Sequence, residues 1–238
     1  MKINLLIPCF VDQLFPSVGI SVVRILEKLG HAVDFKESIL CCGQPAFNAG
    51  YWEETRGIAT RVLEFLAGSD PVVVPSGSCA AMVKNFYPEL FRETSQADAA
   101  TQLSQRVFEF SSFLVDQLGV TDLGSRFPAK VTFHDGCHGL RELHVKDQPR
   151  QLLERVKDLT LVEMEDQTSC CGFGGTFAVK FPMISTAMGE TKSASALDTG
   201  AEYLVSNDSS CLMHLQGLLS RQKQKLKTIH LAEVLASS

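Results

Sequence analysis

The triplet Cys41-Cys42-Gly43 returns later in the chain as Cys170-Cys171-Gly172, and this recurrence decides the fold. The other four cysteines bracket the two triplets, at Cys9, Cys79, Cys137 and Cys211. Corresponding cysteines are separated by 128 to 132 positions, which is just over half of the 238 residues. Isolated buried cysteines have no reason to recur in one order, so the pattern indicates an internal repeat of two similar halves.

Short apolar runs precede the cysteines in both halves and are typical of buried strands. They lie at residues 3–7, 33–35 and 72–74, and again at 131–133, 161–164 and 203–205. The ends of the halves, residues 107–114 and 228–235, also correspond. Longer stretches between the runs have apolar residues at helical spacing, as in Val18, Val22 and Ile25. The sequence therefore predicts an α/β fold of two tandem, pseudo-symmetric βαβ-type domains with small parallel sheets.

The periodicity lapses near residues 124–128, so we divide the chain into a first cysteine-rich repeat, 1–124, and a second, 125–238. Residues 86–106 are rich in Ala, Gln and Ser and mostly polar. A separate helical hairpin is the alternative fold for that segment.

Each cysteine or cysteine pair follows the carboxyl end of a predicted strand. The carboxyl ends of parallel strands meet at one edge of a sheet, where ligands of open α/β sheets bind. Three segments of each half therefore deliver four thiols to one place. The sequence predicts two metal or cofactor sites, one formed by Cys9, Cys41, Cys42 and Cys79 and the other by Cys137, Cys170, Cys171 and Cys211.

Composition and charge narrow the function classes. The chain is 45% hydrophobic and 21% charged, with a net charge of −5, which argues against nucleic acid as the main partner. No apolar run approaches the length of a transmembrane segment. The apolar stretch at the N-terminus is too short for a signal peptide and is cut by Asp12, so we expect a cytoplasmic protein with reduced thiols.

Four thiolates per site suit a [4Fe–4S] cluster and also suit structural zinc. Zinc ligands usually come in pairs spaced by two to four residues, whereas adjacent cysteines direct their sulfurs apart, as a larger cluster requires. We therefore favour an iron–sulfur cluster at one or both sites, with zinc possible at one. Disulfides within the Cys-Cys pairs are a third alternative, which leaves the other four cysteines unexplained.

Two longer segments carry a family resemblance. Residues 41–51, Cys-Cys-Gly-Gln-Pro-Ala-Phe-Asn-Ala-Gly-Tyr, and residues 169–177, Ser-Cys-Cys-Gly-Phe-Gly-Gly-Thr-Phe, resemble the lactate utilization protein A family. So do Pro75-Ser76-Gly77-Ser78-Cys79 and residues 230–235. More distantly, the repeats are similar to the cysteine-rich domains of heterodisulfide reductase and of the glycolate oxidase iron–sulfur subunit.

The sequence departs from the heterodisulfide reductase relatives at two positions. Their repeats end in Cys-x-x-Cys, and Ser76 and Asp208 stand where the additional cysteines would be. An unusual cluster that needs a fifth thiolate is therefore not expected here. Either oxygen can ligate iron, but we favour the interpretation that both residues belong to a turn or a helix cap.

The resemblance implies an oxidoreductase subunit that transfers electrons in a cytoplasmic complex oxidising L-lactate to pyruvate. It also implies two partners, a second iron–sulfur subunit and a small third subunit, and a small 2-hydroxy acid as substrate. Because Gly172-Phe173-Gly174-Gly175 does not complete a dinucleotide-binding motif, we do not expect dependence on NAD. The alternatives are a role with another 2-hydroxy acid such as glycolate, or a non-redox protein with structural zinc.

Further candidates for chemistry lie near the second site. His134 and His138 flank Cys137 and are weak catalytic candidates, suited to hydrogen bonds with cluster sulfurs or to proton transfer. Arg141 and Lys180 are potential carboxylate anchors, although solvated surface charge is the simpler interpretation. The imidazoles and the glycine-rich flank make the second repeat the favoured cluster site. In the first half, Tyr51 and Trp52 suit a partner surface or a packed helix start.

Overall fold

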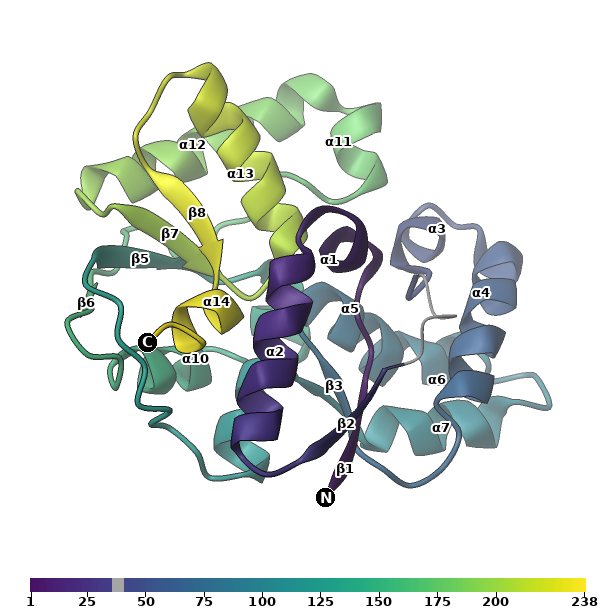
Figure 1. Cartoon of the computed structure of the whole chain (residues 1–238). Coiled ribbons are helices and arrows are strands. Elements are labelled where there is room, and N and C mark those ends of the chain that lie inside the picture. Colours follow the sequence, from purple (N-terminus) through teal and green to yellow (C-terminus); the bar gives the residue numbers. More distant parts are fainter. Residues whose placement is uncertain (36–40) are drawn as a thin grey trace.

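Two four-stranded parallel sheets form the framework of the computed structural model, which describes residues 1–35 and 41–238 (Figure 1). The first sheet has the order β2-β1-β3-β4 and the second the order β6-β5-β7-β8. The strands are β1 (Lys2–Leu5), β2 (Ala32–Phe35), β3 (Val72–Val74), β4 (Val107–Glu109), β5 (Lys130–His134), β6 (Thr160–Leu161), β7 (Tyr203–Ser206) and β8 (Lys227–His230). The prediction of two tandem, pseudo-symmetric α/β units with small parallel sheets is confirmed.

Helices connect the strands. Those of the first half are α1 (Cys9–Leu14), α2 (Pro16–Lys28), α3 (Gln44–Asn48), α4 (Trp52–Phe65), α5 (Gly77–Ala81), α6 (Tyr87–Leu90), α7 (Ala97–Gln105) and α8 (Phe110–Ser112), with π-helical turns η1 (Met82–Phe86) and η2 (Phe113–Gln117). Those of the second half are α9 (Cys137–Glu142), α10 (Asp147–Leu153), α11 (Thr176–Lys180), α12 (Pro182–Asp198), α13 (Ser209–Arg221) and α14 (Leu231–Leu235). The helix α2 shows the sequence logic: Pro16 begins it, and Val18, Val22 and Ile25 bury one face.

The strand order places the cysteines. In each sheet the chain runs from the first strand to a neighbour on one side and then crosses to the other side. The first and third strands of each half, β1 with β3 and β5 with β7, therefore lie at the point where the winding reverses. Such a switch point leaves a crevice at the carboxyl ends of the strands. Cys9, Cys79, Cys137 and Cys211 follow these four strands.

The two halves share a hydrophobic core. Leu5, Phe110 and Phe113 of the first half belong to one buried cluster with Phe133 and Val205 of the second. The helix α2 packs against α14, and α8 packs against α10. This shared core fixes one sheet relative to the other, so residues at the edges of the two sheets keep a defined geometry across the interface. The division at residue 124 stays a prediction.

Residues 86–106 are helical but do not form a separate hairpin. The helices α6 and α7 pack on each other and on the core of the first sheet. Tyr87 and Leu103 lie in the same buried cluster as Val72 and Val74. The segment has few, widely spaced apolar residues, and these form the face that packs on the core. Its mostly polar composition therefore did not reveal this amphipathic face in the sequence.

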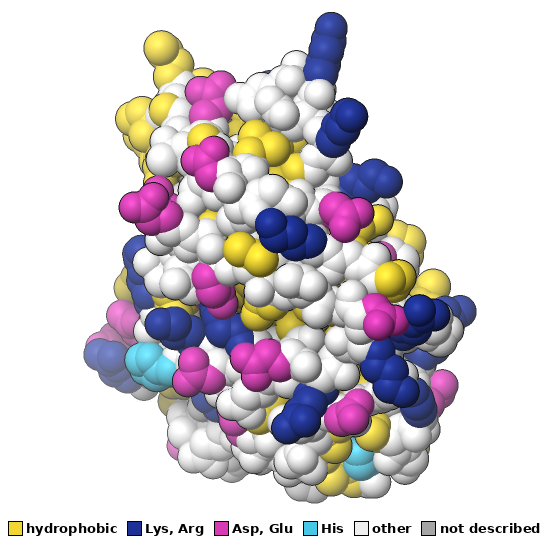
Figure 2. Space-filling model, turned by 90° about the vertical axis from the view of Figure 1, so that its left-hand side faces the viewer, with side chains coloured by type: hydrophobic (Ala, Val, Ile, Leu, Met, Phe, Trp, Pro, Cys, Tyr) yellow, Lys and Arg dark blue, Asp and Glu magenta, His cyan; other side chains and the backbone are white. Residues whose placement is uncertain are grey.

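The surface carries charges of both signs. On the face shown in Figure 2, basic and acidic side chains are interspersed. Among the described helices, none combines the length and the apolar character needed to cross a membrane. Three ionisable side chains are buried in the interior, which is uncommon: Lys192, Glu109 and Asp208 are each no more than 3% exposed.

Candidate metal centres

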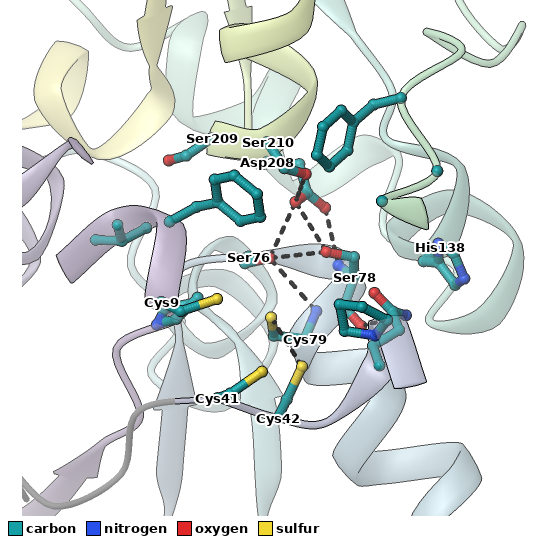
Figure 3. A pocket seen from close by; sticks show the side chains of 18 of the residues that line it. Cys9, Cys41, Cys42, Ser76, Ser78, Cys79, His138, Asp208, Ser209 and Ser210 are labelled. Atoms are coloured by element: carbon teal, nitrogen blue, oxygen red, sulfur yellow. Dashed lines mark hydrogen bonds between the residues drawn. The ribbon is translucent and has the colours of Figure 1, made fainter. Parts of the chain in front are cut away.

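The first site gathers four cysteines from three segments of the first half. Cys9 begins α1, Cys41 and Cys42 lie between β2 and α3, and Cys79 lies in α5 (Figure 3). The Sγ atoms of Cys42 and Cys79 are 3.2 Å apart, and all four cysteines are free thiols. The predicted convergence of these four residues is therefore present in the structure, whereas metal binding by them stays a prediction.

A glycine after each cysteine pair makes the turn possible. Gly43 has φ +86° and Gly172 has φ +88°, a conformation that L-residues with side chains rarely adopt. A Cβ on Gly172 would also lie 2.5 Å from the Ser185 carbonyl oxygen. In this turn the Gly43 amide donates to Cys41 Sγ at 3.3 Å, and the Gly172 amide donates to Cys170 Sγ at 3.4 Å.

Hydrogen bonds among the thiols strongly lower the pKa of one cysteine at each site. Donation from Cys42 and Cys9, together with the Gly43 amide, lowers the pKa of the Cys41 thiol to about 2. The same bonds, with burial, raise the pKa values of Cys9 and Cys42. Without metal, Cys41 is thus a thiolate beside protonated neighbours, so metal binding by the whole set must release protons.

The second site repeats this arrangement with Cys137 at the start of α9, the pair Cys170-Cys171, and Cys211 in α13. Donation from Cys137 and Cys171 lowers the pKa of Cys170 to about 2, as in its counterpart Cys41. The Phe173 amide adds a bond to Cys171 Sγ at 3.5 Å. Amide donors and thiol donors therefore focus on the sulfurs of both sites.

An imidazole distinguishes the second site. His134 ends β5 and is fully buried, and neither of its ring nitrogens has a hydrogen-bond partner among the described residues. One of them forms a group with the sulfurs of Cys171 and Cys211, in which the three ligand atoms lie within 4.8 Å of one another. Burial, with a contribution from Lys192, lowers the pKa of His134 to about 3, so the ring is neutral at neutral pH.

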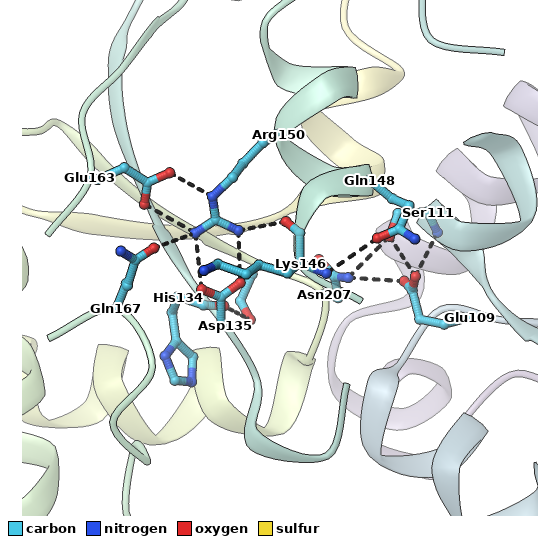
Figure 4. A network of polar contacts seen from close by, with 11 residues as sticks. Glu109, Ser111, His134, Asp135, Lys146, Gln148, Arg150, Glu163, Gln167 and Asn207 are labelled. Carbon is cyan, nitrogen blue, oxygen red and sulfur yellow. Dashed lines mark hydrogen bonds and ion pairs between the residues drawn. The ribbon is translucent and has the colours of Figure 1, made fainter. Parts of the chain in front are cut away.

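Arg150 joins the segments that carry the second set of cysteines (Figure 4). Its guanidinium donates to both carboxylate oxygens of Asp135 at 2.9 Å and reaches Glu163 at 2.6 and 3.0 Å. A further bond, at 2.9 Å, goes to Gln167. Asp135 lies just before Cys137, and Glu163 and Gln167 precede Cys170. Arg150 is therefore a positioning residue for the second site.

Ser76 and Asp208 join the two halves rather than facing a metal as a pair. Asp208 accepts hydrogen bonds from Ser76 Oγ at 3.0 Å, from the Ser78 amide at 2.8 Å and from Ser78 Oγ at 2.9 Å. Ser76 also caps α5 by accepting from the Cys79 amide at 3.4 Å. The cap role that the sequence favoured is present for Ser76, whereas Asp208 stands at the N-cap of α13 without a side-chain cap bond and accepts bonds across the interface instead, as Figure 3 shows.

A cavity of about 90 Å³ lies between the halves and is lined by all four cysteines of the first site. Its second-half wall includes Cys137, His138 and the loop from Phe173 to Gly175. Phe10 and Phe173 meet edge to face beside it, with ring centroids 5.4 Å apart. Behind it, α5 and α9 approach so closely that a Cβ on Gly77 would lie 2.9 Å from Gly139 Cα. The first site thus opens on a chamber that the second half completes.

The remaining residues that the sequence suggested for chemistry or binding lie in different environments. His138 lines the cavity with Nδ1 3.6 Å from Cys137 Sγ, whereas His134 is enclosed. Arg141 and Lys180 are exposed, and neither is among the described residues that line the cavity. Trp52 stacks on Phe47 at 5.3 Å and remains 40% exposed.

Sequence reasoning did not identify Arg150 or Lys192 as site residues. Both act from helices distant in sequence from the cysteines, and a basic residue in a helix usually indicates a solvated face. One feature of the sequence could have indicated that Lys192 is buried. The other residues that α12 buries are all small, namely Ser185, Gly189, Ser193 and Ala196, so this face of the helix packs closely.

The donor chemistry fits a metal centre at each site. Four sulfurs meet at the edge of each sheet, backbone amides already donate to them, and glycines leave room beside them. Thiolate sulfur is the ligand of iron–sulfur clusters and of structural zinc. The donor set therefore fits both kinds of centre.

Comparison with solved structures supports the fold. A hypothetical protein from Helicobacter pylori superposes with a TM-score of 0.68 at 13% sequence identity, over 98% of this chain and 48% of the other. At that identity the likeness concerns the fold alone. This chain spans about half the length of that structure.

Comparison of sequences identifies the family. Residues 3–84 and 131–216 match the cysteine-rich domain family, in agreement with the internal repeat. Lactate utilization protein A 1 of Bacillus mycoides is 46% identical over 238 residues, covering 99% of this chain and 96% of its own. Lactate utilization protein A of Bacillus subtilis is 42% identical with full coverage of both chains. The chain therefore belongs to the lactate utilization protein A family, within the cysteine-rich domain family.

Proposed function

We propose that this chain is an iron–sulfur electron-transfer subunit of a cytoplasmic complex that oxidises L-lactate to pyruvate. One observation carries the proposal: each sheet edge gathers four cysteines, and the interdomain cavity is lined by the whole first set and by Cys137 of the second. The names of the relatives, which are lactate utilization proteins, supply the substrate. Because both sites present the same sulfur and amide donors, we propose a [4Fe–4S] cluster at each.

The reaction fits a pair of one-electron centres. Oxidation of L-lactate to pyruvate removes two electrons and two protons, one from the hydroxyl group and one from the carbon that bears it. Two clusters that each accept one electron balance the electrons without NAD. Both protons need acceptors: we assign the hydroxyl proton to His138, which lines the cavity, and the proton from the carbon passes to water.

The protein needs partners to complete this reaction. The chain contains eight cysteines, all of which are assigned to the two sites, so none remains for a further cluster. We propose that a second iron–sulfur subunit carries the electrons onward and that a small third subunit completes the complex.

Metal and sulfide analysis of the anaerobically purified protein tests the cofactor. We expect iron and acid-labile sulfide in equal amounts, and an EPR signal after reduction. Zinc at both sites without sulfide would instead support a non-redox protein with structural metal. The observation that favours this alternative is the group of His134, Cys171 and Cys211, because imidazole and thiolate together are zinc ligands.

Growth of a deletion strain tests the substrate. A strain that lacks this chain and has no paralogue should fail to grow on L-lactate as sole carbon source, and the reintroduced gene should restore growth. Normal growth on lactate with loss of growth on glycolate would replace lactate by the other 2-hydroxy acid.

A further inference from the structure

Two positions beside the sulfurs differ in chemistry between the halves. His134 lies three residues before Cys137, and Leu6 lies three residues before Cys9.

The second pair of corresponding positions is found by way of the glycine turns. Gly172 packs against Ser185, and Gly43 packs against Thr55. Seven residues after these contacts stand Lys192 in the second half and Val62 in the first. All four side chains, those of His134, Leu6, Lys192 and Val62, are buried, at 2% exposure or less.

Of the two polar side chains of the second half, His134 lacks any hydrogen-bond partner and Lys192 lacks an ion-pair partner among the described residues. Both nitrogens of His134 are without a hydrogen-bond partner among the described residues. Lys192 Nζ donates to the Asp166 carbonyl oxygen and lies 3.8 Å from Met164 Sδ, and none of the described ion pairs includes it. Buried polar groups are normally satisfied, so something at this place is missing from the protein alone.

A negatively charged centre on Cys170 and Cys171 supplies the missing partner. A cluster held by four thiolates has a net negative charge and gains another on reduction. An N–H donor to a ligand sulfur and a buried ammonium behind it both favour the reduced state, and hydrogen bonds to the sulfurs are a known determinant of cluster potential. Leu6 and Val62 provide neither effect at the first site.

We propose that the second centre is the electron-accepting member of the pair, because His134 donates its N–H to a cluster sulfur and Lys192 places a positive charge beside it. This inference rests on the proposed iron–sulfur function. The substrate cavity adjoins the first site, so the first electron passes from the first centre to the second, where the reduced cluster is more stable, and the first centre can then accept the second electron. His134 and Lys192 thus act through the cluster as positioning and tuning residues.

Redox titration followed by EPR tests the proposal on the second centre alone. The background is Cys9→Ser/Cys42→Ser, which removes the first centre. Into it we introduce His134→Leu, which reproduces the first-half residue, and Lys192→Met, which keeps length and removes charge. We expect each change to shift the midpoint potential to a more negative value. Lys84→Met is the matched control, since Lys84 is half-buried, donates to Ser104 and Val107, and should leave the potential unchanged.

A spectroscopic measurement identifies the imidazole. His138 also lies near this centre, with Nδ1 3.6 Å from Cys137 Sγ, so the variants assign the signals. In protein labelled with 15N-histidine, the reduced second centre should show a weak nitrogen coupling from His134 that His134→Leu removes and His138→Gln retains. Loss of the coupling in His138→Gln instead would overturn the assignment.

The outcomes separate the inference from the function on which it rests. Zinc without iron and sulfide in the background variant overturns both. The inference is overturned if the cluster is intact and its midpoint potential is the same in the background variant, after addition of His134→Leu and after addition of Lys192→Met. That result leaves the proposed electron transfer unaffected. Because a midpoint potential does not depend on occupancy, a variant that binds less iron still gives a result. The Lys192→Met variant decides the matter if His134→Leu does not fold.

Discussion

The first and second cysteine sites have the same sulfurs in the same places, but different surroundings. The first borders an interdomain cavity and has Leu6 and Val62 at two buried positions. The second has His134 and Lys192 there, and Arg150 ties its segments together. Duplication has therefore kept the ligands and varied what lies behind them. This division suits one centre that meets a substrate and another that holds electrons.

The largest effect should come from removing one sulfur from either site. Cys42→Ser and Cys171→Ser each remove a buried sulfur ligand, and we expect each to lose about half of the iron and sulfide of the wild-type protein, because each site has its own four ligands. The two variants are each other's control. Complete loss of iron in one and none in the other would show that only one site holds a cluster.

The next effect concerns the framework of the second site alone. Arg150→Met leaves the fully buried carboxylate of Asp135 without its bidentate partner, which typically costs about 3–5 kcal/mol. We expect lower iron content at the second site and a lower urea midpoint. Arg126→Met is the control, because the Arg126–Asp158 pair is mostly exposed and such pairs contribute about 0–1 kcal/mol. Equal effects of the two substitutions would contradict the role given to Arg150.

Glu109 makes stability depend on pH at the interface of the halves. Its side chain caps α8 and accepts from Asn207 Nδ2 at 3.1 Å, and burial raises its pKa from 4.5 to about 7. Between these values the folded carboxyl keeps a proton that the unfolded one has lost, so stability falls as pH rises. The loss approaches about 3 kcal/mol above pH 7.

Urea unfolding at pH values of about 5 and about 7.5, on either side of most of this change, measures the dependence. In Glu109→Gln the difference in unfolding free energy between the two pH values should shrink, since the amide cannot ionise. An unchanged difference would mean that another group carries the dependence.

The smallest effect distinguishes the two sites by access. Phe10→Ala removes the edge-to-face contact with Phe173, and such pairs contribute about 0.5–1.5 kcal/mol. The cavity beside the first site should open more often, so air should destroy the first centre roughly two- to tenfold faster and affect the second less, because only Cys137 of its ligands lines this cavity. Phe181→Ala, which disturbs the Phe177–Phe181 pair in a half-exposed position, is the control. Faster loss of the second centre would contradict this assignment of the cavity.

Much of the fold could be predicted because its signals are local. Runs such as Val72–Val74 have the composition of a buried strand, and the cysteines mark the carboxyl ends of the strands. The repeat then predicts that both halves fold alike. Sequence reasoning also placed imidazoles at the second site, although it did not separate the enclosed His134 from the cavity-lining His138.

Contacts between the halves could not be predicted. The bonds from Ser76 and Ser78 to Asp208 connect residues 132 and 130 positions apart, and no local pattern specifies them. The burial of Lys192 depends on close packing of α12 on α13, where a Cβ on Gly189 would lie 2.3 Å from Leu218 Cδ1. The segment 86–106 was uncertain for the same reason, since its partner surface lies on another element.

The comparison between the halves depends on clusters being present, so the most direct test is the content of each isolated site. Iron, acid-labile sulfide and zinc are measured in anaerobically purified Cys9→Ser/Cys42→Ser protein and in Cys137→Ser/Cys171→Ser protein. We predict iron and sulfide in equal amounts, with little zinc, in both variants. Zinc without sulfide in both would contradict the account.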